Sequence, residues 1–517
     1  MRPRLLLLSC ALALVGCRFD RSGLTVRDGG SVDVAADQHA LDAVADGAPD
    51  GVLDSAVDRG PGDGAVESVA DQALQDQIVL DQTPLDQALL DQLLPDQIIP
   101  DQIVPDQIVP DLPVPDLPVP CAGLTCPLGC NTGADRCNRL KPTGHSASGY
   151  FDSVTGDLTH PTLNITLNTD SGEIRAGTST VLRPAGQPGA VVNGIYWGTL
   201  PAVSIAYPAV SVFGVASLGV PQGRILAVVG SSALAIYATG DITVAGTMSA
   251  SADAQTPGPG GFAGGPQDGA NGATCFGGEG QGGGQGGSGS SQVEAGGGGG
   301  GRKVVGGKGG DAAYSSYTAS GGAAGAAVGT ATLWPLFGGC GGGAGGGPDT
   351  ASSQSHGGYG GGGGGAIQLA ANGTITVSGV ITVHGAGGQG GRYGAGGGGG
   401  GSGGAVLLEA PTVTVSGAVT ANGGGGGAGA ASTGSNGQDG QNGHEDATNA
   451  LGGAGVSTGG SGGNGGALSP ETGAGAPTDA NAGGGGGAAG VIRVNSATDA
   501  LSGVVSPAPS TGAPGTW

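Results

Sequence analysis

Long runs of glycine are the feature that most constrains the fold of this chain. Glycine accounts for 120 of the 517 residues and gathers in three tracts, at about 256–365, 385–404 and 423–487. Because glycine loses more backbone entropy on ordering than any other residue, such tracts fold only with unusually regular hydrogen bonding. They are therefore either disordered loops or packed polyproline II strands, in which glycine lets backbones approach closely. A collagen triple helix is excluded because the glycine period breaks repeatedly, for example across 265–269.

Between the glycine tracts, short segments alternate apolar and polar residues, which predicts β-strands. A longer unit then recurs, in which two short strands joined by a tight connection are followed by a glycine and a third short strand. The two clearest copies are residues 366–383 and 405–421, an earlier copy begins at Ala235, and a degraded copy covers residues 491–504.

The recurrence of this three-strand unit predicts the fold class. A unit too small to bury its own face is typical of an all-β, parallel β-solenoid (β-helix-like) fold, here with long glycine-rich inserts. Stacked Ile, Val and Leu ladders would replace the aromatic core that a chain with 3% aromatic residues lacks. A β-sandwich is the alternative, but its strands do not need to resemble one another in threes. The alternation places Ile375, Val377, Val413 and Val415 in one stacked core.

Six cysteines predict disulfides. Four of them lie within seventeen residues with the spacing C-x4-C-x3-C-x6-C, which lacks the paired C-x-x-C knuckles of a zinc site. In an exported protein two disulfides are expected there, and the sequence leaves three connectivities open. A third disulfide is expected within the first glycine tract. The cysteines are Cys121, Cys126, Cys130 and Cys137 in the cluster, and Cys275 and Cys340 in the tract.

The segment that precedes the cysteine cluster is acidic and repetitive. Residues 17–120 hold 21 acidic residues against 4 arginines, a net −17 of the −23 carried by the whole chain. From Asp71 to Asp116 an aspartate recurs every five residues, and a proline recurs at the end of each unit from Pro95 onward. The prolines remove ladder donors, so an extended stalk is favoured over a pentapeptide-repeat β-helix. The acidic charge argues against nucleic-acid binding.

The N-terminus carries an export signal. Arg2 and Arg4 precede an apolar stretch at 5–14 that is too short to span a bilayer, and Leu14-Val15-Gly16-Cys17 closes it. This closing segment resembles the lipobox of bacterial lipoproteins. The resemblance implies that residues 1–16 are cleaved and that Cys17 is acylated, which anchors the chain to a membrane. Arg18 follows the cysteine, in place of the aspartate associated with inner-membrane retention, which favours the outer membrane.

The whole arrangement resembles glycine-rich bacterial surface lipoproteins of the kind called PGRS-like. The resemblance rests on architecture and low-complexity motifs, and it implies display on the cell surface without a particular chemistry. The expected parts are a signal peptide (1–16), an acidic stalk (17–120), a four-cysteine knot (121–140), a β-rich start of the solenoid (141–255), a glycine-rich insert (256–365) and interrupted rungs (366–517).

Motifs that suggest chemistry are weak in glycine-rich sequence. Residues 400–404 and 459–463 match G-x-S-x-G, but neither has the strand and helix of a nucleophile elbow. Residues 306–314 fit one copy of the calcium-binding nonapeptide, but that repeat needs stacked neighbouring copies to hold an ion. Residues 306–310 resemble a phosphate loop but lack the Ser or Thr that follows its lysine. His444-Glu445-Asp446 is expected to be a solvated loop. We predict no catalytic residue, metal site or cofactor.

The function expected from the sequence is a structural or adhesion protein at the cell surface, with a glycan or another cell-surface molecule as its partner. A carbohydrate-active β-helix enzyme (a polysaccharide lyase or hydrolase) is the first alternative. A hydrolase needs two paired acids, but the clear acids on the predicted strands, Asp241 and Glu409, occupy non-equivalent positions. A lyase needs basic residues in one groove, and only Arg493 stands out. The second alternative is a glycan- or ice-binding module built from glycine-rich polyproline II strands.

Overall fold

The computed structural model divides the chain into two units, residues 1–107 and 108–517. It describes residues 121, 123–145, 152–204, 206–272, 275, 287–289, 293–347, 355–432 and 434–517, all in the second unit. Within these residues every regular element is a β-strand and there is no helix, so the expected all-β class holds. The predicted signal peptide, Cys17 and the aspartate repeats lie outside the described residues.

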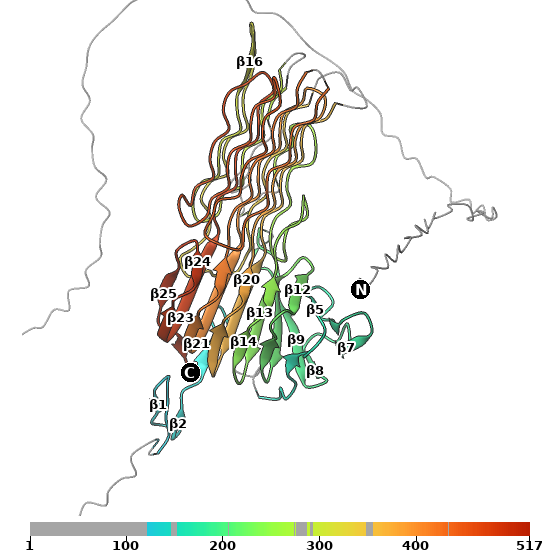
Figure 1. Cartoon of the computed structure of the whole chain (residues 1–517). Helices are drawn as coiled ribbons and strands as arrows, with labels where there is room; N and C mark the ends of the chain where they lie inside the picture. The colour runs from blue at the N-terminus through green and yellow to red at the C-terminus, as the bar shows by residue number, and fades with distance from the viewer. Residues whose placement is uncertain are drawn as a thin grey trace, which may run out of the picture. The chain divides into compact units, whose positions relative to one another are not determined.

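Most of the strands form three parallel ladders, labelled in part in Figure 1. Ladder A contains β10 (Val210–Val215), β13 (Ala233–Ala238), β18 (Ala366–Ala371) and the first halves of β21 (Ala405–Val415) and β23 (Val491–Leu501). Ladder B contains β4 (Leu158–Thr159), β11 (Leu218–Val220), β14 (Ile242–Val244), β19 (Thr374–Val377) and the second halves of β21 and β23. Ladder C contains β5 (Ile165–Asn168), β12 (Ile225–Val229), β15 (Thr247–Ser249), β20 (Val380–Thr382), β22 (Ala418–Thr420) and β24 (Val504–Ser506).

Antiparallel strands extend the N-terminal ends of these ladders. Strands β6 (Ile174–Ala176) and β7 (Thr180–Arg183) continue ladder C, and β8 (Ala190–Val192) and β9 (Ile195–Leu200) continue ladder A. At the C-terminal end, β25 (Ser510–Gly512) pairs with β23, and β26 (Gly515–Thr516) pairs with β3 (Leu140–Lys141). Two separate hairpins are β1 (Cys130–Asn131) with β2 (Arg136–Cys137), and β16 (Ala312–Tyr314) with β17 (Tyr317–Ala319).

Equivalent positions of successive copies form the apolar core. Ile375 pairs with Val413 and Val377 pairs with Val415, and all four side chains are at most 1% exposed in one cluster. Their predicted stacking is confirmed. The earlier copy was placed wrongly on strand β13, because Leu234, not Ile236, lies opposite Ile367. The error is a shift of two residues, which keeps Leu234 and Ile236 on the same inward face, so alternation does not distinguish the two registers.

The described parts of the glycine tracts are packed, and their hydrogen bonds repeat every three residues. Gly397, Gly400 and Gly403 donate in turn to Ala482, Gly485 and Ala488 at 2.9–3.0 Å. The residues next to them, Gly398 and Gly401, donate to Gln389 and Ala386, and Gly399 and Ser402 donate to Gly343 and Cys340. A period of three matches polyproline II, which has three residues per turn.

The segment 396–404 lies in the middle of this packing. It donates to three neighbouring segments, 340–346, 383–389 and 482–488, and it accepts from three others, 297–300, 358–364 and 424–427. We call the whole set of packed glycine-rich segments the glycine bundle. Figure 1 shows its segments running side by side next to the labelled strands. The packed alternative, not the disordered one, therefore holds for the described parts of the tracts.

Candidate functional site

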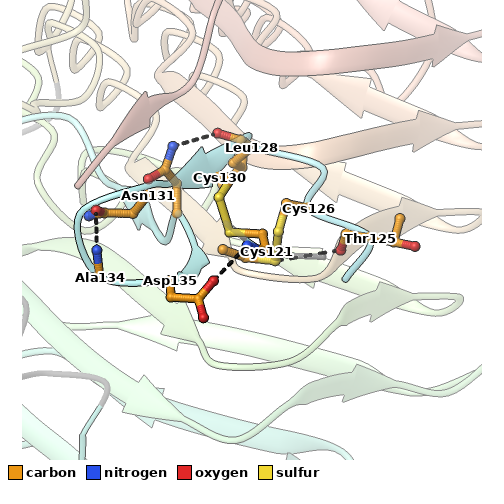
Figure 2. Close-up of a disulfide and its surroundings, with 10 residues drawn as sticks. Cys121, Thr125, Cys126, Leu128, Cys130, Asn131, Ala134 and Asp135 are labelled. Atoms are coloured by element: carbon orange, nitrogen blue, oxygen red, sulfur yellow. Dashed lines mark hydrogen bonds between the residues drawn. A yellow bond between two sulfur atoms is a disulfide. The ribbon is translucent and has the colours of Figure 1, made fainter. Parts of the chain in front are cut away.

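The four-cysteine cluster forms two disulfides around the β1–β2 hairpin (Figure 2). The first cysteine pairs with the third and the second with the fourth, as Cys121–Cys130 and Cys126–Cys137, with Cα atoms 6.1 and 5.0 Å apart. The backbone N–H of Cys121 donates to Asp135 Oδ1 at 2.6 Å, which links the start of the cluster to the turn of the hairpin. The sequence alone had left this connectivity open.

The third disulfide lies inside the glycine bundle. Cys275 and Cys340 are both fully buried, and their Cα atoms are 5.7 Å apart. The backbone N–H of Cys340 donates to Ser402 Oγ at 2.8 Å, and Ser402 is also buried. The serine of this G-x-S-x-G match therefore joins two segments of the bundle, and it is not presented as a nucleophile.

Glu409 is the one buried acid on the outward face of ladder A. Its carboxylate accepts hydrogen bonds from Gln368 Nε2 at 2.6 Å and from Asn495 Nδ2 at 3.0 Å, which come from the strands on either side. It also accepts from Thr143, through the hydroxyl at 2.7 Å and the backbone N–H at 3.1 Å. Buried carboxylates need such donors. Glu409 thus fastens the segment around Thr143 to the outside of the sheet.

Asp241, the other acid singled out on the strands, lies at the turn before β14 in ladder B and is exposed. Its Oδ1 accepts from the backbone N–H of Thr374 at 2.7 Å and from the Thr374 hydroxyl at 3.1 Å. Arg493 donates to Asn495 Oδ1 and to the carbonyl oxygen of Ala331. Glu409 and Arg493 therefore share Asn495 as a hydrogen-bond partner, whereas Asp241 lies apart from them in ladder B.

His145 lies over the outward face of ladder A, next to the Glu409 group. Its ring contacts Tyr237 and Trp334 edge-on, with centroid distances of 4.7 and 5.5 Å. Only 4% of the residue is exposed. Burial penalises the charged imidazolium and lowers the pKa of His145 from 6.5 to about 4.

The remaining sequence motifs also have local roles. Lys308 pairs with Asp311 at 2.7 Å, and Asp311 accepts from the backbone N–H of Gly321, so the calcium-like nonapeptide is tied to its own bundle. His444 contacts the Thr448 hydroxyl and the Gln441 side chain through its two ring nitrogens. In the described ranges no group of three or more His, Cys, Asp or Glu side chains could hold a metal ion.

A polar groove on the side of the glycine bundle is the best candidate binding site. It consists of two adjoining cavities of about 380 and 350 Å³ that share Gln389 and Asp439. Its other side-chain lining is Asp253, Ala254, Gln255, Tyr359, Asn442, Arg392, Asn436 and Gln438.

Side chains at the edge of the bundle shape this groove. Asp439 Oδ1 accepts from the backbone N–H of Gly390 at 2.8 Å, and Asn442 Oδ1 accepts from that of Gly387 at 2.9 Å. These oxygens take the place of carbonyl groups that a further strand would supply. Sequence reasoning missed the groove. The available signal was the three-residue spacing of Asn436, Asp439 and Asn442 between glycines.

No protein-family model, no curated protein and no solved structure matches the chain. The described residues also contain no helix with the length and apolar character needed to cross a membrane.

Proposed function

We propose that this chain is a lipid-anchored cell-surface protein without catalytic activity, which presents a rigid glycine-rich bundle for adhesion to, or interaction with, another surface. The anchor is the acylated Cys17, the location is the outer membrane, and residues 17–120 form the stalk. The fold is a parallel β-solenoid, supported by the three ladders in which successive units pair parallel and in register.

The order of the described parts of the glycine tracts is the observation that carries this proposal. A flexible tether needs no order, and glycine loses the most backbone entropy when it is fixed. Here the tracts are nonetheless joined by regular hydrogen bonds, and the segment 396–404 is surrounded by six others. An interior of this kind supports a role in which a stiff surface is presented.

The hydrogen bonds of Glu409 and Asp241 support a role without catalysis. A glycosidase holds two carboxylates about 5–10 Å apart on rigid elements, facing a common space. Glu409 is surrounded by donors of its own chain under the Thr143 segment, and Asp241 holds the start of β19. The enzyme alternative would need other acids than these.

Replacement of Cys17 tests the anchor. We expect Cys17→Ser to abolish labelling with a radioactive or clickable fatty acid and to release the protein from the membrane fraction. Cys10→Ser, within the apolar leader, is the matched control and should leave both properties unchanged. A Cys17→Ser protein that still carries acyl chains would rule out the proposed anchor.

Adhesion is tested separately. Cells that display the full chain should attach to a glycan-bearing cell layer or matrix more strongly than cells that lack it. Equal attachment of the two would contradict the adhesion role while leaving the anchor intact.

A further inference from the structure

The polar groove has a floor and two walls that different segments of the bundle supply. The floor contains Tyr359 and Gln389, which are partly buried, together with the neighbouring glycines. One wall lies within the segment 436–442, and the other is formed by residues 253–255. Gln389 donates its backbone N–H to the carbonyl oxygen of Tyr359 at 2.9 Å, so the two floor residues are held side by side.

The long wall has a regular repeat. A Cβ atom added at Gly437, Gly440 or Gly443 would meet backbone atoms of the bundle, so every third residue faces inward. The residues between these glycines are exposed, and Asn436, Asp439 and Asn442 form one row. At about 3.1 Å per residue, this row repeats about every 9 Å. A ligand that follows the wall would therefore be an extended polymer with a comparable repeat.

The groove side chains suit a ligand rich in hydroxyl groups. An amide offers two donors and an acceptor, and a hydroxyl group both donates and accepts, so amides match polyols in either direction. Five amides line the groove: Gln255, Gln389, Asn436, Gln438 and Asn442. The Tyr359 ring adds an apolar face with a polar tip, against which the carbon–hydrogen face of a sugar ring can pack.

The charge of the groove selects among polymers. Asp253 and Asp439 are exposed carboxylates, and Arg392 is the single cationic residue among those that line the groove. Carboxylates repel phosphates, sulfates and uronic acids. Hence we propose that the groove binds an extended, uncharged polysaccharide chain. This inference rests on the proposed interaction function and assigns the class of partner.

Calorimetry on the purified full chain in detergent tests the inference. The probes are the neutral cellohexaose, laminarihexaose, maltohexaose, mannohexaose and xylohexaose, with heparin and polygalacturonate as anionic probes. We expect binding of at least one neutral hexasaccharide and none of the anionic polymers. Tyr359→Ala and Gln389→Ala should each weaken that binding by about tenfold, which corresponds to about 1.4 kcal/mol.

Tyr314→Ala is the matched control, because Tyr314 is 59% exposed on β16 and does not line the groove. It should bind as the unaltered chain does, and thermal melting should show that all three variants are folded. No binding of any neutral probe, equal binding of an anionic probe, or unchanged affinity in both groove variants would overturn the assignment. Cells that display the Tyr359→Ala protein and still attach would contradict the groove assignment alone. Cells that display the unaltered chain and attach no better than cells without it would contradict the proposed function.

Discussion

Placing one methyl group in the centre of the glycine bundle should destabilise it, although alanine is the smallest possible replacement. Gly399 donates to Gly343 and accepts from Gly361, each at 2.8 Å, and it is buried. A Cβ atom at this position would collide with the carbonyl oxygen of Gly298, which is backbone and cannot rotate away. The segment that contains Gly298 must therefore move outward.

That movement gives the magnitude. The neighbours of Gly298 make two hydrogen bonds to the central segment, Gly297 to Gly397 and Gly300 to Gly400, each at 2.9 Å. Leaving a buried polar group unpaired costs about 1–3 kcal/mol, so stretching both bonds costs about 2–6 kcal/mol. Alanine also restricts the unfolded chain, which offsets about 0.4–1 kcal/mol. The expected net loss for Gly399→Ala is about 1–6 kcal/mol.

Gly475→Ala is the matched control, because its Cβ atom would lie 3.5 Å from the carbonyl oxygen of Lys308, an ordinary contact. This variant should be stabilised by about 0.4–1 kcal/mol. Urea unfolding followed by circular dichroism measures both changes. Hydrogen exchange of peptides that cover 296–301 and 396–404 should be faster in Gly399→Ala only. If the two variants have the same stability, the bundle is not packed as described.

Two further substitutions test other parts of the structure. Val415→Asp places an unpaired charge in the core beside Val377 and should destabilise the chain by about 3–5 kcal/mol. The control Thr414→Asp, on the opposite and partly exposed face, should change stability by less than about 0.5 kcal/mol. Equal thermal shifts of the two variants would refute this assignment of faces. Burial lowers the pKa of His145 to about 4, so between about pH 6.5 and pH 4 the unfolded chain binds a proton that the folded chain does not. The free energy of unfolding should therefore fall by up to about 3 kcal/mol as the pH drops through this window. His145→Phe should remove that component, and parallel pH profiles of urea unfolding for the two proteins would contradict it.

Local alternation was enough to predict the stacked core but not every register. In β19 the buried residues Ile375 and Val377 alternate with Thr374 and Thr376, so the sequence itself shows which face is apolar. Strand β13 reads ALAIYA and is buried on both faces, because Leu140 and other residues cover its outside. The predicted copy is displaced by two positions, and a two-residue shift keeps Leu234 and Ile236 on the same inward face, so alternation cannot distinguish the two registers.

The glycine bundle and the Glu409 group show a second limit. A run of glycines has no side-chain pattern, so the same sequence is compatible with a packed and with a disordered state. The hydrogen bonds that decide between the two join residues such as Gly300 and Gly400, which lie far apart along the chain. Glu409 likewise meets Thr143, which is 266 residues away along the chain. Contacts of this range depend on the finished topology, which periodicity in one segment does not give.

The ladders and the bundle are also directly continuous, which ties their stabilities together. Strand β20 ends at Thr382 and the chain passes into the bundle at Val383, while the central segment of the bundle ends at Gly404, immediately before β21. At this junction Gly404 donates to the carbonyl oxygen of Val383 at 2.8 Å, so a segment that leaves ladder C is bonded to one that enters ladder A. A shift of one segment within the bundle would therefore pull on the register of a ladder, where a one-residue slip exposes the apolar face. The apolar ladders thus help to fix the register of a bundle in which few side chains can do so, and this explains how glycine-rich segments can be held stiffly enough to form a groove.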